Sequence, residues 1–288
     1  MRDLNYELKI MCKSSRDGSF ATQSARNHVL QQVADELHEL GYKKLKANNL
    51  KPKHIVALVS HWQSKELAPG TIKNRMSHVR WLTEKLGRSS IVASNTELNI
   101  DRRVHVDNDA NKSRELNYDK LANISDPYTA ASLELQRAFG LRREEAIKFS
   151  SSYADRGDKL VLKGSWCKGG RVREIPVKNQ HQRDVLDRIK TITEGGALIR
   201  PDRNYIQQLK IYERETIRVG LDRNHGLRHS YAQDRYKEIA GFKCPAAGGK
   251  ISRELTLDEK LVDQIARQKI SRELGHEREQ ITAIYLGR

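Results

Sequence analysis

Apolar residues recur at helical spacing through most of the first hundred positions of the chain. Stripes of this kind predict amphipathic helices, because residues three and four apart lie on the same face of a helix. Three stripes are present, at 29–40, at 52–64 and from about 69 to 87. Gly41 and Gly87 follow the first and third of them, where helices often end. The first part of the chain is therefore predicted to fold as a compact helical bundle.

The periodicity is lost from residue 89 onward, and segment 96–113 is rich in Ser, Asn, Asp and basic residues. Such a composition is typical of a connection between domains. Beyond it, two helical patterns meet at Gly140, and two β-rich runs, 160–162 and 172–177, flank a Lys-Gly-Gly turn. This arrangement predicts a hairpin of two antiparallel strands.

Further helical patterns follow the hairpin, at 180–192, 205–219, 226–239, 257–268, 270–274 and 279–286. The turn-rich stretch 241–256 interrupts them and is predicted to be a surface insertion. The expected fold class is mainly α with a small antiparallel β-sheet. Its parts are a helical domain at 1–95, an interdomain linker at 96–113 and an α+β domain at 114–288.

The balance of charged residues indicates which class of molecule the protein binds. The 288 residues include 53 Lys and Arg against 37 Asp and Glu, and the resulting formal net charge of +16 favours binding to a polyanion such as nucleic acid. No run approaches the ~20 apolar residues of a membrane span, and the first residues lack the apolar run of a signal peptide. We therefore expect a cytoplasmic protein with no membrane partner.

The cysteine and histidine patterns do not indicate a metal site. The three cysteines are far apart and form no C-x-x-C pair, so neither a zinc site nor a disulfide framework is expected. His225 and His229 have the spacing of the zinc-protease pair, but the glutamate of H-E-x-x-H is missing. Arg228 stands between them instead, and an arginine repels a cation and attracts phosphate.

Four short segments of the second domain hold side chains suited to one reaction. They are FGLRREEA with Arg142, CKGGRVREIP with Lys168, HGLRHSYA with His225 and Arg228, and LGHEREQITAIY with His276 and Tyr285. Each alone has an ordinary interpretation as a solvated charge, a turn residue, a hydrogen-bonded histidine or a core tyrosine. Together they offer two arginines for phosphate oxygens, a histidine and a lysine for proton transfer, and a phenol to attack phosphorus. They indicate phosphodiester transfer without a metal.

In these segments the chain resembles the tyrosine recombinases, also called phage-type integrases. The motifs of that family are T-G-L-R-x-x-E-L, G-K-G-x-K-x-R-x-V-P, H-x-L-R-H-x-x-A and L-G-H-x-x-x-x-x-T-x-x-Y, in this order. The resemblance covers most of the second domain, and it includes the nine-residue step from His276 to Tyr285. Any one motif is weak, whereas four in the right order are strong.

The resemblance implies a catalytic role for six residues. Arg142, Arg228 and His276 would hold the scissile phosphate and neutralise the charge of its pentacoordinate transition state. Tyr285 would attack it, giving a 3′-phosphotyrosyl bond and a free 5′-hydroxyl. Proton transfer would fall to His225 as base or relay and to Lys168 as general acid. No cofactor is implied, because the phosphotyrosine stores the bond energy.

Other features follow from the resemblance with less support from motifs. Glu145 matches an acidic position of the family and would orient Arg142. The first domain corresponds in length and helical pattern to the family's core-binding module, with Lys73 and Arg75 of its third helix as candidate DNA contacts. The implied partners are double-stranded DNA with paired recombination sites, three further copies in a homotetramer on that DNA, and DNA-bending accessory proteins. The implied type is a simple two-domain recombinase, acting at the nucleoid.

Three other interpretations stay open at the level of sequence. A type IB topoisomerase would share the nucleophile and relax supercoils. A DNA-binding protein would keep the fold without catalysis. An RNA-binding protein would carry the motifs by coincidence.

Overall fold

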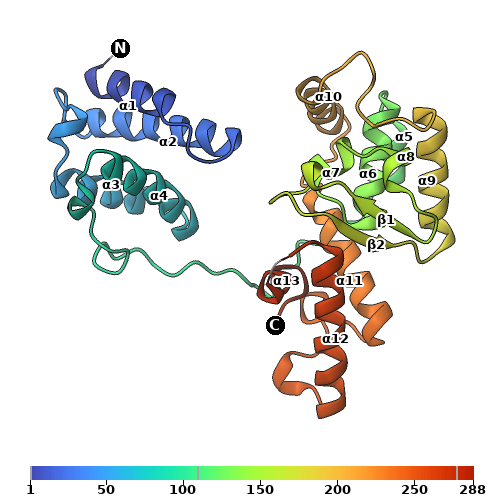
Figure 1. Cartoon of the computed structure of the whole chain (residues 1–288). Coiled ribbons are helices and arrows are strands. Elements are labelled where there is room, and N and C mark those ends of the chain that lie inside the picture. Colours follow the sequence, from blue (N-terminus) through green and yellow to red (C-terminus); the bar gives the residue numbers. More distant parts are fainter. Residues whose placement is uncertain (1, 109, 277) are drawn as a thin grey trace. The chain divides into compact units, whose positions relative to one another are not determined.

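The computed structural model describes residues 2–108, 110–276 and 278–288. It divides into two compact units, Met1–Val104 and His105–Arg288, each with its own core (Figure 1). The described residues are mostly helical and contain one antiparallel sheet of two strands. The predicted fold class is thus confirmed. No helix among the described residues is both long and apolar enough to cross a membrane.

Unit 1 is a bundle of four helices, α1 (Asp3–Ser14), α2 (Phe20–Glu39), α3 (Pro52–Ser64) and α4 (Pro69–Lys85). Proline opens both α3 and α4, where its fixed φ suits the first helical turn and no backbone donor is lost. Trp62 is fully buried among the four helices and donates its indole N–H to Glu36 over 2.7 Å. The three stripes in the sequence are α2, α3 and α4, whereas α1 was not predicted.

The chain stays on unit 1 for some way beyond α4. Ile91, Leu98 and Ile100 are buried with the apolar residues of the four helices. Regular structure is absent from 101 to 107, and most of these side chains are exposed. Within the segment expected to be a linker, the first residues therefore contribute to a core.

Unit 2 combines helices with the hairpin. Its strands are β1 (Lys159–Leu162) and β2 (Arg173–Pro176), and Leu160 pairs with Ile175 in the antiparallel register. Both of these side chains are fully buried. Its helices are α5 (Tyr118–Ala122), α6 (Pro127–Phe139), α7 (Arg143–Ile147), α8 (Ser151–Ala154), α9 (Gln180–Thr193), α10 (Tyr205–Arg218), α11 (His225–Ala240), α12 (Leu257–Glu273) and α13 (Glu279–Leu286).

Helix α6 lies at the centre of unit 2 and packs against α7, α9 and α11 (Figure 1). Leu133, Leu135 and Phe139 of α6 have no exposed surface. Helix α11 in turn packs against α12 and α13, and α12 also contacts β2. This packing brings the end of α6, the start of α11 and the connection from α12 to α13 together.

Two predictions for the last fifty residues were wrong. The helices expected at 257–268 and 270–274 are one helix, α12, because no Gly or Pro interrupts the pattern between them. Segment 241–256 is not simply a surface insertion. Cys244 within it is fully buried in the core of unit 2, and the 3₁₀ turn Pro245–Ala247 packs against α13.

Candidate active site

The first arginine of the site is placed by a sharp change of backbone direction. Gly140 ends α6 in the left-handed region at φ 61°, and Arg142 follows as the cap of α7. Glu145 accepts the Arg142 backbone N–H at 2.7 Å and its guanidinium at 2.8 Å. The guanidinium is therefore held at the start of α7 with 24% of the side chain exposed.

Arg228, one turn into α11, is fully buried. Its guanidinium donates to two backbone carbonyls, that of Gly140 and, at 2.5 Å, that of Leu274. These carbonyls lie at the ends of α6 and α12, so the Arg228 side chain connects three of the four segments that carry predicted residues. Burial lowers the pKa of Arg228 to about 10, which still leaves the group charged at neutral pH.

Tyr285 lies on α13 with only 6% of its surface exposed. Its hydroxyl oxygen is 3.3 Å from Arg228 Nε and 3.3 Å from His225 Nε2 at the start of α11. The His276 ring stacks on the phenol ring at 5.3 Å between centroids, and the His229 ring lies at 4.4 Å. The phenol is thus enclosed by cationic and imidazole groups of the same chain.

His276 follows Gly275, which leaves α12 at φ 66°. Its Nδ1 lies 3.0 Å from Thr282 Oγ1, and its Nε2 lies 3.4 Å from Arg228 Nη2. Burial and the nearby arginines lower the pKa of His276 to about 3. The ring is therefore neutral near pH 7, accepting at Nε2 and donating from Nδ1.

One buried carboxylate balances the arginines. Burial raises the pKa of Glu145, but the hydrogen bonds and charge of Arg173 outweigh it and, with the other arginines, lower the pKa to about 2. Arg173 of β2 forms two hydrogen bonds of 2.7 Å with Glu145. Arg173 was not singled out in the sequence, although it occupies the arginine position of the family's second motif. It links the hairpin to the arginine cluster.

Lys168 stands in the turn between β1 and β2, next to Gly169 and Gly170, and its side chain is exposed. Among the residues that the structure describes, Lys168 makes no hydrogen bond or ion pair with the other five predicted residues. The structure therefore brings together Arg142, His225, Arg228, His276 and Tyr285, with Arg142 joined to the group through Glu145. It leaves Lys168 on a neighbouring exposed turn.

The two residues predicted to contact DNA in unit 1 are both on α4 and partly exposed. Arg75 already has an internal partner, since it donates to Glu36 at 2.9 Å and lies over the Trp62 ring. Lys73 is partly exposed and lies next to the buried Ile72 in the chain.

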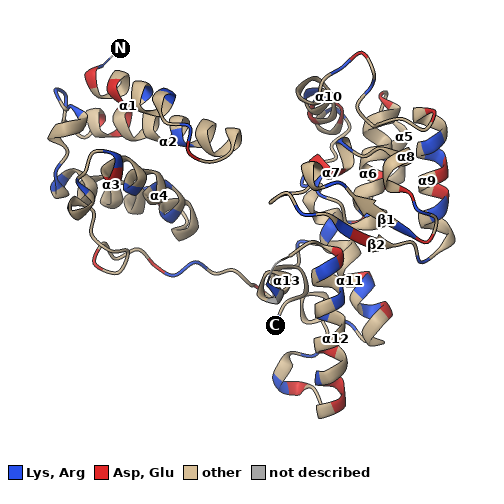
Figure 2. Cartoon of the chain, viewed as in Figure 1, with Lys and Arg blue, Asp and Glu red and all other residues tan. Residues whose placement is uncertain are grey.

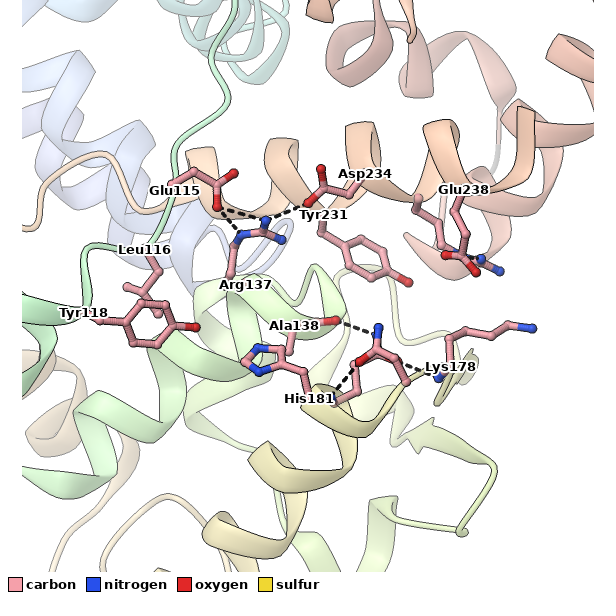
Figure 3. A pocket seen from close by; sticks show the side chains of 13 residues that line it. Glu115, Leu116, Tyr118, Arg137, Ala138, Lys178, His181, Tyr231, Asp234 and Glu238 are labelled. Atoms are coloured by element: carbon pink, nitrogen blue, oxygen red, sulfur yellow. Dashed lines mark hydrogen bonds and ion pairs between the residues drawn. The ribbon is translucent and has the colours of Figure 1, made fainter. Parts of the chain in front are cut away.

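A pocket of about 380 Å³ in unit 2 contains none of the predicted catalytic residues (Figure 3). Arg137 of α6 crosses it and pairs with Glu115 at 2.9 Å and with Asp234 of α11 at 2.6 Å. Because this guanidinium already has two acidic partners, the pocket is a junction between segments of unit 2. No group of three or more metal-ligating side chains occurs in the described parts of the chain.

The arrangement suits in-line attack on a phosphodiester. The Arg228 guanidinium and the His225 imidazole lie 3.3 Å from the phenol hydroxyl, the His276 ring stacks on the phenol ring, and Arg142 retains exposed surface. Guanidinium groups match the oxygens of phosphate and stay charged in a buried site. A phenol becomes a nucleophile when a neighbouring base takes its proton.

Two family models match the sequence. The one described as "Phage integrase, N-terminal" matches residues 1–92, and the one described as "Integrase" matches residues 106–234. No curated protein sequence matches the chain.

Solved structures share the fold at low sequence identity. A λ integrase dimer bound to a COC′ core site has a TM-score of 0.61 and 16% identity, covering 99% of this chain and 96% of that chain. The XerH site-specific recombinase bound to a palindromic difH substrate has a TM-score of 0.62 and 16% identity, covering 99% and 81%. The Tn1549 transposon integrase with circular-intermediate DNA has a TM-score of 0.56 and 11% identity, covering 100% and 96%.

Proposed function

Since the chain belongs to the phage integrase family of tyrosine recombinases, we propose that it cuts and rejoins DNA at specific sites through a covalent bond to Tyr285. One observation carries the assignment of the nucleophile. The Tyr285 hydroxyl lies 3.3 Å from the guanidinium of Arg228 and 3.3 Å from the imidazole of His225, in the same chain. A tyrosine with only a packing role needs neither neighbour.

The proposed step is a transesterification. The Tyr285 oxygen attacks the scissile phosphorus, a 3′-phosphotyrosyl ester forms, and the bond from phosphorus to the 5′ oxygen breaks. His225 accepts the phenol proton, directly or through a relay. Attack on this ester by the 5′-hydroxyl of another strand reverses the chemistry and completes strand exchange.

Charge stabilisation is assigned to three residues. Arg142 and Arg228 contact the nonbridging oxygens, where negative charge grows in the pentacoordinate transition state. His276 donates to one of these oxygens once its proton moves from Nδ1 to Nε2 and the phosphate replaces Arg228 as the partner of Nε2. Glu145 supports this role because it holds Arg142 from the side of the protein core and leaves the outer face of the guanidinium for substrate. Lys168 protonates the leaving 5′ oxygen, which requires the exposed hairpin turn to close over the bound phosphate.

Double-stranded DNA is the proposed partner. Lys and Arg occur along both units, including α4, α9 and α11 (Figure 2), and the net charge of +16 favours a polyanion. Lys73 and Arg75 remain proposed phosphate contacts, with Arg75 exchanging Glu36 for DNA. A λ integrase tetramer has been solved on a Holliday junction, and we propose the same number of copies here, acting on paired sites in the cytoplasm, with DNA-bending accessory proteins.

The assignment is tested by trapping the covalent intermediate. We expect a duplex carrying the protein's own site and a nick beside the scissile phosphate to yield a protein–DNA adduct resistant to SDS. Tyr285→Phe should abolish the adduct because the variant has no attacking oxygen. The matched control Tyr118→Phe changes an exposed tyrosine and should leave the adduct yield unaltered.

Adduct formation by Tyr285→Phe would refute the assignment of Tyr285 as the nucleophile. The absence of an adduct with the wild-type protein on its own site would refute the proposed enzymatic activity. The product then separates the enzyme classes. Recombinant junctions from two paired sites support a recombinase, whereas relaxed circles without junctions would assign a topoisomerase instead.

A further inference from the structure

The segment that leads from unit 1 into unit 2 makes specific contacts with α11. We call Asn108 and residues 110–114 the linker strap. Asn111 of the strap and Gln233 of α11 exchange a pair of amide hydrogen bonds, Asn111 Nδ2 to Gln233 Oε1 at 3.2 Å and Gln233 Nε2 to Asn111 Oδ1 at 2.8 Å. Gln233 is 8% exposed, whereas Asn111 is exposed, so the pairing is shielded from water on the α11 side.

Gln233 also reaches the nucleophile. Its Nε2 donates to the backbone carbonyl of Tyr285 at 3.1 Å. This carbonyl belongs to the last turn of α13, which ends at Leu286, and carbonyls of a last turn have no partner within their own helix. The Gln233 side chain therefore hydrogen-bonds both to Asn111 of the strap and to the backbone carbonyl of Tyr285.

The strap is fixed on both sides of Asn111. The Ser230 hydroxyl of α11 lies 2.7 Å from Ser113 Oγ and donates to the Arg114 carbonyl at 2.6 Å. The Arg114 amide donates to the carbonyl of Gly226 at 3.1 Å. A Cβ at Gly226 would lie 2.4 Å from the Arg114 side chain, so the strap follows α11 in direct contact. Beyond the strap, the Glu115–Arg137–Asp234 network of Figure 3 holds the same path.

The other end of the strap contacts the end of α13. Asn108 accepts the backbone N–H of Arg288 at 3.1 Å and donates to its carbonyl at 2.9 Å. Helix α13 has only eight residues, a length at which a helix depends on its tertiary contacts. Its position, and with it the direction of the phenol, is therefore set by α11, α12, the 3₁₀ turn Pro245–Ala247 and the strap.

We propose that Asn111 and Gln233 are positioning residues for the nucleophile, holding the Tyr285 backbone so that its hydroxyl faces Arg228 and His225. This inference rests on the proposed function of Tyr285. The separations of 3.3 Å from the hydroxyl leave little tolerance, and a displacement of about 1 Å in a reacting group can slow a reaction by about 100-fold. The segment joining the two units is thereby part of the frame of the active site.

The experiment compares variants of the full-length protein on the nicked duplex, measuring the rate of adduct formation and DNA affinity separately. Gln233→Met keeps the size of the side chain and removes its donor, and we expect the rate to fall by about 10- to 100-fold with affinity changed less than about twofold. Asn111→Ala should act in the same direction. Asn111→Asp keeps the acceptor for Gln233 and should retain more of the rate than Asn111→Ala.

Two further variants test the mechanism of the effect. The double variant Asn111→Ala, Gln233→Met should be no slower than Gln233→Met alone, because both changes break one connection. Gln180→Ala is the control, since the side chain of this exposed glutamine on α9 bonds, within the described parts of the chain, only to Asp184, and it should match the wild type. An unchanged rate in Gln233→Met would overturn the proposal, and so would equal losses of rate and affinity, which indicate general unfolding.

Hydrogen exchange gives a readout that does not depend on catalysis. Amides of residues 280–288 should exchange faster in Gln233→Met than in the wild type, while those of α9 remain unchanged. If the wild-type protein forms no adduct, the proposed function fails, and this exchange still decides whether the strap holds α13. Equal exchange rates in the two proteins would then refute the proposal that the strap and Gln233 hold α13 in place.

Discussion

Arg228 is the side chain on which the site depends at the scale of single residues. It is fully buried, and its hydrogen bonds to the carbonyls of Gly140 and Leu274 offset part of the cost of removing a charge from water. Glu145 supplies the nearest negative charge, 4.0 Å away. A buried guanidinium held on two sides by backbone cannot turn away, so the site keeps its geometry before any substrate binds.

The low pKa of His276 predicts a dependence of stability on pH. In the folded state the pKa of His276 is about 3, below the ordinary value of 6.5. Between pH 3 and pH 6.5 a proton therefore binds this imidazole more strongly in the unfolded chain than in the folded protein. The free energy of unfolding should therefore fall as the pH falls from 6.5 toward 3. Urea unfolding at pH 7 and pH 5 measures this, and His276→Gln should lose less stability between the two than the wild type.

The control for this experiment is His105→Gln, because His105 is exposed. It should show the same loss between pH 7 and pH 5 as the wild-type protein. A His276→Gln variant with the full wild-type loss would mean that this imidazole titrates normally in the folded protein.

At the scale of elements, the turn between α6 and α7 places Arg142. Gly140 has a positive φ, and a Cβ there would lie 2.4 Å from the ring of Tyr231 on α11. The end of α6, the start of α7 and a proposed catalytic arginine, Arg142, meet near this glycine, so a side chain at position 140 would disturb all three.

Gly140→Ala should lower the free energy of unfolding by about 2–4 kcal/mol, combining the left-handed backbone with the steric conflict. Gly157→Ala is the matched control, because Gly157 has φ 86° and open space where its Cβ would lie. It should cost only about 1 kcal/mol. Equal losses of stability in urea titrations of the two variants would contradict the role of the Tyr231 contact.

Much of the fold at this scale could be predicted from local pattern. The periodicity of the apolar residues predicted the bounds of α3 correctly, and the paired β-rich runs predicted the hairpin. Helix α1 was missed because its apolar residues Leu4 and Leu8 are few and their partners come from α2 and beyond. The burial of Cys244 in a turn-rich segment was missed for the same reason, since composition does not show what a loop packs against.

The site was only partly predictable. The motifs predicted the residues that lie around Tyr285 in the fold. They could do so because a group that takes part in a reaction must be of a particular chemical type, which the sequence shows directly. The motifs did not indicate Gln233 or Asn111, because these residue types are common and the two residues are 122 positions apart in the chain. Such pairs follow from the path of the chain in space.

At the scale of the whole molecule, two cores are joined by residues 101–107, which have no regular structure. Arg102 and Arg103 in this segment are exposed, and exposed irregular backbone is the preferred substrate of proteases. Brief digestion with trypsin should therefore cut first in 101–107 and release two resistant fragments, identified by mass spectrometry. Arg102→Gln with Arg103→Gln should slow this cut, and a first cut inside either unit would contradict the division.

Asn108 and Arg288 are 180 positions apart in the chain and hydrogen-bonded in space. The beginning and the end of unit 2 thus meet at one corner. A short glycine bridge closing that corner would permit circular permutation, with new ends opened in an exposed loop elsewhere. A bulky tag fused after Arg288 would instead crowd the corner and strain the anchoring of the last helix.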